Sequence, residues 1–260
     1  MVMEDGNPRD AVFTTLAWDG TGFIADWNLH FARMQRHAAR LRIQLPSNLQ
    51  QQVAKQIDEL NRDAAENNLA RTPNGLLRIQ CSSDGEIRVE ARSFLLRDEE
   101  IDAITLPAPR WGKKINGTKH GAWQAYRDAR ATAEKKGVDL ALLVHDYAIV
   151  DADRATPVLL DEDGTAWIAS VNEGGAESVT MAVLIPVLEQ LGVPLNHGKL
   201  NERIVARAAE IIAVGSGIGV CQIISIDGED VGGISTLSTL CRTALKEHYE
   251  KLTTWTRLEA

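Results

Sequence analysis

The chain has 260 residues and a net charge of −8 at pH 7, with 44% hydrophobic and 25% charged residues. This composition is typical of a globular protein of one large or two modest domains, long enough to bury a sizeable core. The acidic balance argues against a nucleic-acid partner, which would need a basic face to neutralise phosphates. No apolar run approaches the roughly 20 residues of a membrane-spanning helix, so no membrane partner is expected.

Cysteines, histidines and the first residues bear on compartment and metal binding. Cys81, Cys221 and Cys241 are odd in number, widely spaced and set in apolar surroundings, which is typical of structural thiols in a reducing compartment. The histidines show no metal-like spacing. The opening "MVMEDGNPRD" is acidic and polar, unlike a signal or transit peptide. We therefore expect a cytoplasmic protein without a metal site.

The first half of the chain predicts two hairpins with two helices between them. Residues 11–27 form two β-rich runs about a "DGTG" turn, and residues 75–94 form a second hairpin about "SSDG". The apolar spacing of residues 28–45 predicts an amphipathic helix stopped by Pro46. A more polar helix is expected over about 48–69.

The stretch "LPAPRWGKKINGTKHG" is rich in Pro, Gly and Lys and marks a candidate domain boundary. We expect an N-terminal domain over residues 1–108, a linker over 109–118 and a C-terminal domain over 119–260. Beyond the linker the pattern predicts a helix, several short strands, two helices, a strand and a last helix, at about 121–137, 139–170, 179–192, 200–212, 220–226 and 235–251. Strands grouped in this way favour a mixed α/β or α+β fold over a doubly wound parallel sheet.

Lys119 stands out because it lies where the helix after the boundary is expected to begin. A cation is unfavourable there, near the positive end of the helix dipole. Lys119 is therefore either an exposed side chain without a function or a lysine that is kept neutral and nucleophilic.

Two glycine- or hydroxyl-bearing segments are candidate phosphate sites. The "GSGIGV" stretch (215–220) has glycines spaced loosely like a dinucleotide-binding loop. However, a helix is expected before it and a strand after it, the reverse of that motif. Its turn could still cradle a phosphate. Ser178 or Thr180 can cap the helix near residue 179, and a helix N-terminus beside a hydroxyl suits a phosphate, although a capped helix alone is unremarkable.

Three charged residues can be interpreted either as ordinary solvated side chains or as part of a functional site. Arg33 lies among apolar neighbours on the first predicted helix and is by default a solvated arginine. Asp151 and Asp153 follow an apolar strand, where turn carboxylates are usually solvated. No nucleophile–histidine arrangement is visible in the sequence.

Together these patterns resemble, in order along the chain, the class IV aminotransferases, which are fold-type IV pyridoxal-phosphate (PLP) enzymes. That family includes branched-chain and D-amino-acid aminotransferases and aminodeoxychorismate lyase. "FTT" with "HFARMQRHAARLRIQLP" resembles the first strand and the His-x-x-Arg-Leu helix, and "KHGAWQAY" falls at the Schiff-base lysine. "GVDLALLVHDYAIVDADRATPVLL", "ESVTMAVLIPVLEQLGVPL" and "GSGIGVCQIISIDGEDVGG" are similar to three later family motifs. The resemblance covers roughly residues 10–245.

The resemblance implies a role for each candidate residue. Lys119 would carry PLP and move the substrate proton, Arg33 would clamp the phosphate, and Asp151 would pair with the pyridine nitrogen. The remaining phosphate-binding positions are Val179, Thr180, Ser216 and Gly217. Weaker candidates for the substrate pocket are Phe13, Thr15, Trp111 and Tyr126.

Several positions depart from the family pattern. Asp151 replaces a glutamate and is one methylene shorter, so Asp153 is a rival for its role. Thr156, Ser178 and Met181 replace the family's asparagine, glycine and arginine, and the Arg-Gly pattern is missing from "RIQCSSDGEIRVEAR". Cofactor binding is thus better supported than turnover.

The resemblance implies a PLP enzyme that acts on a small amino compound, with transamination favoured. Lyase-type elimination giving 4-aminobenzoate is the first alternative, because "FTT" and "KH" look like that branch. A degenerate, non-catalytic PLP-binding member is the second, and a binding protein without cofactor is the third. The family also implies a homodimer of two-domain subunits, each with a small N-terminal α/β domain and a larger barrel-like C-terminal domain.

Overall fold

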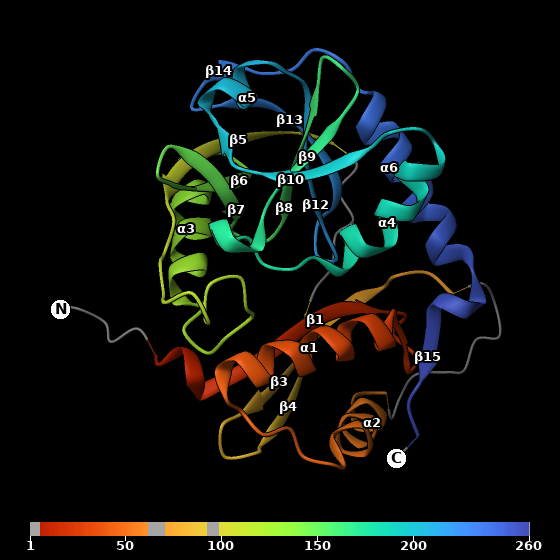
Figure 1. Ribbon diagram of the computed structural model, residues 1–260. Helices are drawn as coiled ribbons and strands as arrows, with labels where there is room; N and C mark the ends of the chain where they lie inside the picture. The colour runs from red at the N-terminus through yellow and green to blue at the C-terminus, as the bar shows by residue number, and fades with distance from the viewer. Residues whose placement is uncertain (1–5, 62–70, 93–98, 260) are drawn as a thin grey trace. The chain divides into compact units, whose positions relative to one another are not determined.

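The computed structural model describes residues 6–61, 71–92 and 99–259 and alternates groups of strands with helices (Figure 1). The described helices are α1 (Trp27–Leu41), α2 (Leu49–Leu60), α3 (Gln124–Lys135), α4 (Val179–Gln190), α5 (Glu202–Ala206) and α6 (Thr236–Glu250). The described strands are β1 (Ala11–Trp18), β2 (Phe23–Ala25), β3 (Gly75–Ser82), β4 (Ile87–Arg92), β5 (Glu100–Pro107), β6 (Leu140–His145), β7 (Ala148–Ala152), β8 (Thr156–Asp161), β9 (Ala166–Ala169), β10 (Leu195–Gly198), β11 (Leu200–Asn201), β12 (Ala208–Gly215), β13 (Gly219–Ile226), β14 (Glu229–Asp230) and β15 (Trp255–Arg257). None of the helices in these ranges is long and apolar enough to cross a membrane.

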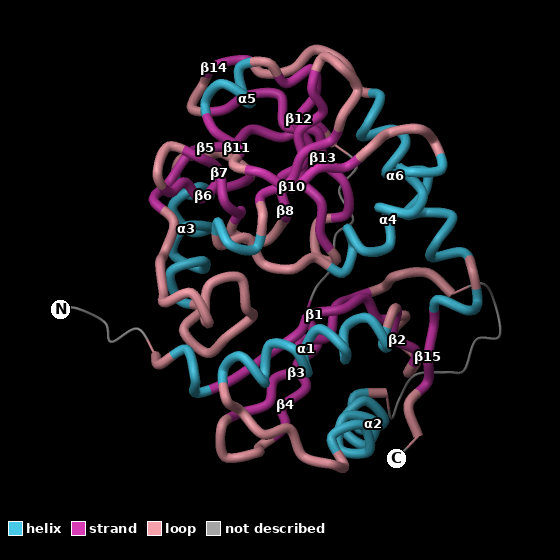
Figure 2. Tube along the Cα trace, in the orientation of Figure 1, coloured by secondary structure: helices cyan, strands magenta, loops and turns pink. Residues whose placement is uncertain are grey.

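The strands form two separate sheets (Figure 2). The smaller has the order β15-β2-β1-β3-β4 and is antiparallel throughout. The larger has the order β10-β9-β8-β12-β13-β5-β6-β7-β11, with β14 paired to β13, and mixes parallel and antiparallel neighbours. Because β11 at one end also contacts β9 near the other, the larger sheet is nearly closed. The expected mixed α/β fold with a barrel-like sheet is confirmed.

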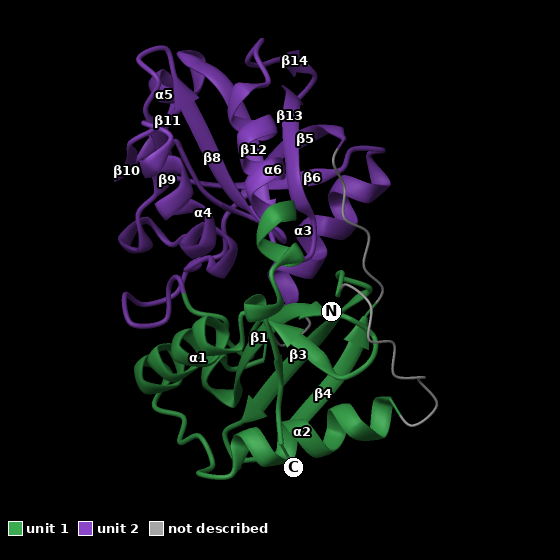
Figure 3. Cartoon of the chain, turned by 90° about the vertical axis from the view of Figure 1, so that its right-hand side faces the viewer, with its two compact units in different colours: residues 1–95, 118–123, 246–260 green, residues 96–117, 124–245 purple. Residues whose placement is uncertain are grey.

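The chain divides into two compact units, coloured separately in Figure 3. Unit 1 comprises residues 1–95, 118–123 and 246–260, and unit 2 comprises residues 96–117 and 124–245. These boundaries differ from the expected ones at residues 108 and 119. Most of the predicted linker, residues 109–117, belongs to unit 2. The short segment 118–123, which contains Lys119, belongs to unit 1, and so do the C-terminal residues 246–260.

Unit 1 is built on the smaller sheet, with α1 packed against β1 and α2 against β4 (Figure 1). Both predicted hairpins and both predicted helices are present in this unit. However, α1 ends at Leu41, before Pro46, because Arg42 takes a left-handed φ of 62° and its N–H bonds back to the last turn. The predicted end of α2 near residue 69 lies outside the described residues.

Unit 2 contains the barrel-like sheet, on which α3 contacts β6 and α4 contacts β12. The helix predicted over 200–212 is wrong: α5 covers only Glu202–Ala206, and β12 follows. Its "IIAV" residues are completely buried between β8 and β13, where β-branched side chains pack well. Strand β5 is not predicted by the sequence pattern. Its buried apolar residues are separated by exposed acidic ones, so no apolar run marks the strand.

The three cysteines, all within the described residues, are buried thiols that form no disulfide. Burial is the main cause that raises the pKa of Cys81, and the same effect raises the pKa of Cys241 to about 12. These thiols are therefore packing residues, as their apolar surroundings predict.

Candidate functional site

Lys119 lies in a short segment of unit 1 that is bonded on both sides. Its carbonyl oxygen accepts from the N–H of Phe13 on β1 at 3.2 Å, and its own N–H donates to Nδ1 of His37 on α1 at 3.1 Å. The next residue, His120, forms a β-bridge with Val12. Helix α3 begins only at Gln124, so the expectation that Lys119 lies at a helix N-terminus is wrong. The helix dipole acts over about one turn and does not explain this lysine.

The chain approaches its neighbours closely just after Lys119. A Cβ atom on Gly121 would lie 2.9 Å from the carbonyl oxygen of Asn7 and 3.0 Å from the backbone nitrogen of Ala11. Only glycine fits this approach without displacing backbone. Gly121 thus allows the Lys119 segment to run alongside the start of β1.

A chain of aromatic contacts begins at the Lys119 side chain within unit 1. Its Nζ lies 4.5 Å from the centroid of the Trp123 ring, and Trp123 meets Phe13 edge-to-face at 5.0 Å. The buried Arg78 guanidinium lies 3.6 Å above the Phe13 ring. Burial, followed by the charge of Lys119 and by His37, lowers the pKa of His120 to about 4, so this imidazole is neutral near pH 7.

Arg33 is not the solvated arginine that its default interpretation predicts. It is only 5% exposed on α1 and donates to Oγ1 of Thr14 at 2.7 Å. The same hydroxyl bonds to Nδ1 of His30 at 2.8 Å. Phe13 and Thr15 leave β1 on the face opposite Thr14, because side chains alternate along a strand. Among the predicted residues of unit 1, Lys119 is hydrogen-bonded to the backbone of Phe13. Arg33 instead bonds to the side chain of Thr14, on the other face of β1.

In unit 2, Asp151 lies buried on β7 within a cluster of polar and aromatic groups. Its carboxylate accepts from the backbone N–H of Ala176 at 3.2 Å and of Ala152 at 3.0 Å. It is also hydrogen-bonded to the phenol of Tyr126; burial first and then this carboxylate raise the pKa of Tyr126 well above its ordinary value. Trp111 stacks on Tyr126 with centroids 6.3 Å apart. The structure thus brings together three residues predicted separately.

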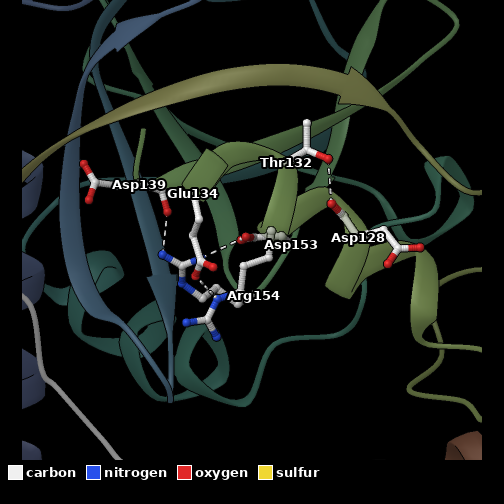
Figure 4. Close-up of polar contacts among 7 residues, drawn as sticks. Asp128, Thr132, Glu134, Asp139, Asp153 and Arg154 are labelled. Atoms are coloured by element: carbon white, nitrogen blue, oxygen red, sulfur yellow. Dashed lines mark hydrogen bonds and ion pairs between the residues drawn. The ribbon is translucent and has the colours of Figure 1, made fainter. Parts of the chain in front are cut away.

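Asp153, the rival carboxylate, has a different environment (Figure 4). Its side chain is completely buried and pairs with Arg154 at 2.8 Å, and Arg154 also donates to the carbonyl oxygen of Asp139. Burial raises the pKa of Asp153 to about 6, although the charges of Arg154 and Arg130 work in the opposite direction. Asp153 is therefore bound into a separate network, and Asp151 is the better candidate for a ligand contact.

The predicted phosphate-binding residues flank the start of α4 and a neighbouring turn. Ser178 caps α4 by accepting from the N–H of Met181 at 3.2 Å, and Val179 is the first helical residue. The hydroxyls of Thr180 and Ser216 lie 3.2 Å apart. Ser216 and Gly217 belong to the turn between β12 and β13, so a strand precedes "GSGIGV", not the helix expected there. The rejection of a dinucleotide loop holds, because a strand also follows.

A family model described as amino-transferase class IV matches residues 11–226. The chain belongs to the class IV aminotransferases. This confirms the resemblance that the ordered motifs predict, and it makes the protein an enzyme whose cofactor is pyridoxal 5'-phosphate. A binding protein without a cofactor is excluded.

Solved structures share the fold at low sequence identity. The branched-chain aminotransferase of Thermoproteus uzoniensis is 18% identical, with a TM-score of 0.78 over 95% of this chain and 90% of that one. A candidate 4-amino-4-deoxychorismate lyase of Legionella pneumophila is 14% identical, with a TM-score of 0.76 over 96% and 97%. A PLP-bound hypothetical aminotransferase of Mycobacterium tuberculosis is 18% identical, with a TM-score of 0.75 over 95% and 94%. No curated protein matches the chain significantly.

Each unit by itself holds residue types that suit a part of PLP. A lysine for the aldehyde and a buried arginine for the phosphate lie in unit 1, at Lys119 and Arg33. The hydroxyls of Thr180 and Ser216 beside a helix N-terminus suit a phosphate, and the Asp151 carboxylate suits a protonated ring nitrogen; these lie in unit 2. Within the described ranges, no group of three His, Cys, Asp or Glu residues could hold a metal ion.

Three buried residues of unit 1 escaped the sequence analysis. His37 lies one helical turn after Arg33, so the spacing on the predicted helix could have identified it. Arg78 interrupts the apolar run of β3, which is a recognisable signal of a buried charge. The neutral state of His120 depends on burial by distant segments and leaves no local signal.

Proposed function

We propose that this class IV enzyme transaminates a small amino compound and that Lys119 carries PLP and transfers the substrate proton. The observation that supports this best is the way Lys119 is held: both of its backbone polar groups are bonded, one to β1 and one to α1. A lysine that must reach a reacting carbon repeatedly benefits from such a fixed main chain.

Transamination also requires a lysine that can lose its proton and an acid that pairs with the ring nitrogen of the cofactor. PLP, when bound, accepts the electrons of the substrate α-carbon into its ring. Lys119 has to be neutral to act as a nucleophile or base, and a nearby cation favours loss of its proton. Unit 1 buries two such cations, Arg33 and Arg78. Asp151, held by Tyr126 and the Ala176 N–H, would pair with a protonated ring nitrogen.

Two other functions have specific support. The likeness to a candidate 4-amino-4-deoxychorismate lyase supports elimination, in which the same lysine and acid would act. The replacements at Thr156, Met181 and Asp151 support a degenerate member that binds PLP without turnover.

The deciding experiment is an absorption spectrum of the purified protein with added PLP, before and after borohydride reduction, followed by peptide mapping. We expect a visible band and a reduced pyridoxyl group on Lys119, and neither in Lys119→Ala; the exposed Lys114→Ala is the matched control. An absent band, or a label scattered over Lys113, Lys114 and other surface lysines, would contradict the proposal.

A panel of amines then separates the three functions. A transaminase converts its PLP to the pyridoxamine form with at least one amine and returns it with an oxo acid. A lyase releases an elimination product instead. A Lys119-labelled protein whose spectrum no amine changes would be a silent binder.

We also propose a homodimer and a cytoplasmic location. The family resemblance supports the dimer, which sedimentation equilibrium would test. Three buried thiols without a disulfide support a reducing compartment, which fractionation of the source cells would test.

A further inference from the structure

One face of α1 carries three buried basic or imidazole side chains in a row. His30, Arg33 and His37 follow one another at spacings of three and four residues, which places them on the same side of the helix. Their exposed fractions are only 2%, 5% and 1%. Such residues are rarely buried on a packing face unless they are bonded. This polar stripe therefore requires an explanation beyond core packing.

The first two members of the polar stripe bond to the same hydroxyl. Arg33 donates to Oγ1 of Thr14, so the hydroxyl proton of Thr14 is directed at Nδ1 of His30. Burial and then the charge of Arg33 lower the pKa of His30 well below its ordinary value, consistent with a neutral acceptor. This end of the stripe fixes the Arg33 guanidinium against β1.

The third member, His37, contacts the backbone of Lys119. Its Nδ1 accepts the Lys119 N–H at 3.1 Å, which requires an unprotonated Nδ1. Phe13 on β1 binds the opposite, carbonyl side of the same residue at 3.2 Å. Since Lys119 belongs to a segment outside any helix, these two bonds tie its main chain to both β1 and α1.

We propose that His37 is a positioning residue for Lys119: its Nδ1 fixes the main chain of the lysine relative to α1, the helix that also carries Arg33. The inference rests on the proposed function of Lys119. Its consequence is that one rigid helix sets the separation between the lysine that carries the cofactor and the arginine proposed for the phosphate. Neither residue needs to contact the other for this to hold.

The test compares three variants of His37 with the wild type. His37→Leu keeps the volume and removes the acceptor, whereas His37→Asn keeps an acceptor atom on Cγ, at the position of Nδ1. His37→Gln places its oxygen one bond farther out. The matched control is Gln35→Leu, which alters an exposed residue of the same helix.

Two readouts are measured on the protein before any substrate is added: hydrogen exchange of the Lys119 amide, and the rate at which PLP with borohydride labels Lys119. For His37→Leu we expect faster amide exchange and labelling slowed by about tenfold or more. His37→Asn should recover both to within about threefold, and Gln35→Leu should match the wild type. If His37→Leu fails to fold, His37→Gln replaces it, with the same direction expected.

The outcomes distinguish this inference from the proposed function. Wild-type labelling and exchange in His37→Leu, or no recovery in His37→Asn, would overturn the role of His37 while leaving Lys119 in place. If the wild type itself is not labelled at Lys119, the proposed function fails, and the role of His37 toward the cofactor falls with it. Amide exchange still shows in that case whether His37 anchors the segment.

Discussion

The two units differ in the kind of ionisable side chain that they bury. Of the described Asp, Glu, His, Lys and Arg residues that are buried as a whole, those in unit 1 are all basic or imidazole groups, namely His30, Arg33, His37, Arg78 and His120. Those in unit 2 are all carboxylates, namely Asp151, Asp153 and Glu210. Fully buried charges are costly, so each set must be compensated within its own unit.

The compensation differs as well. In unit 1 the partners are a hydroxyl, a main-chain N–H and the faces of aromatic rings. In unit 2 they are mostly backbone N–H groups, with one arginine at Asp153. Unit 2 therefore holds its carboxylates mainly through backbone donors, whereas unit 1 holds its basic groups through a hydroxyl, the main chain and aromatic rings.

The largest expected effect concerns Glu210, the completely buried carboxylate of β12. It accepts from the N–H groups of Leu237 and Ser238 at 2.6 and 2.7 Å, where α6 begins. Glu210→Ala leaves two buried donors unsatisfied at a helix N-terminus, and we expect it to lower the free energy of unfolding by about 3 kcal/mol or more. Urea denaturation followed by circular dichroism measures this.

Glu210→Gln keeps one acceptor oxygen and should lose less stability than Glu210→Ala. The exposed Glu229→Ala is the control. Equal midpoints for Glu210→Ala and Glu229→Ala would show that the buried carboxylate does not stabilise α6.

The next effect separates Asp151 from Asp153. We expect Asp151→Asn to lower the rate of the amine half-reaction by about 100-fold, because an amide cannot balance a protonated ring nitrogen. Asp153→Asn should stay near the wild-type rate, since its partner is Arg154. Stopped-flow spectra of both variants with the best amine of the panel measure the two rates; a larger loss in Asp153→Asn would reverse the assignment.

The smallest effect is a pH-dependent gain of stability in Asp153→Asn. Because the folded pKa of Asp153 is raised to about 6, the folded state binds its proton more tightly than the unfolded chain. Its contribution to stability is therefore present at low pH and is lost as the pH rises from about 4 to about 6. Above pH 7 we expect Asp153→Asn to be more stable than the wild type by about 1–3 kcal/mol.

Thermal unfolding of both proteins at pH 4 and at pH 8 measures the difference. The gain should shrink at pH 4, where the wild-type carboxyl is protonated in the folded state and about half protonated in the unfolded chain. A difference that is equal at the two pH values would indicate a packing effect of the amide instead.

Local patterns were sufficient for most elements of the fold. The hairpins around "DGTG" and "SSDG", α1 and α6 all follow from periodicity and turn residues. Local patterns failed at β12, whose "AAEIIAVG" suits a helix by composition but fills the middle of a sheet. Pairing with strands distant in sequence decided that element, because a central strand buries both faces against residues that no local window contains.

By itself the sequence determined the family and the identity of the candidate residues, because ordered motifs depend only on residue type and spacing. Tertiary structure decided what surrounds those residues. The sequence pattern predicts that Lys119 begins a helix, but its segment instead bonds to β1 and α1. Asp151 and Asp153 are equivalent in sequence, yet one bonds to Tyr126 and the other to Arg154. Burial and long-range hydrogen bonds set the charge and direction of a side chain, and both depend on residues far away along the chain.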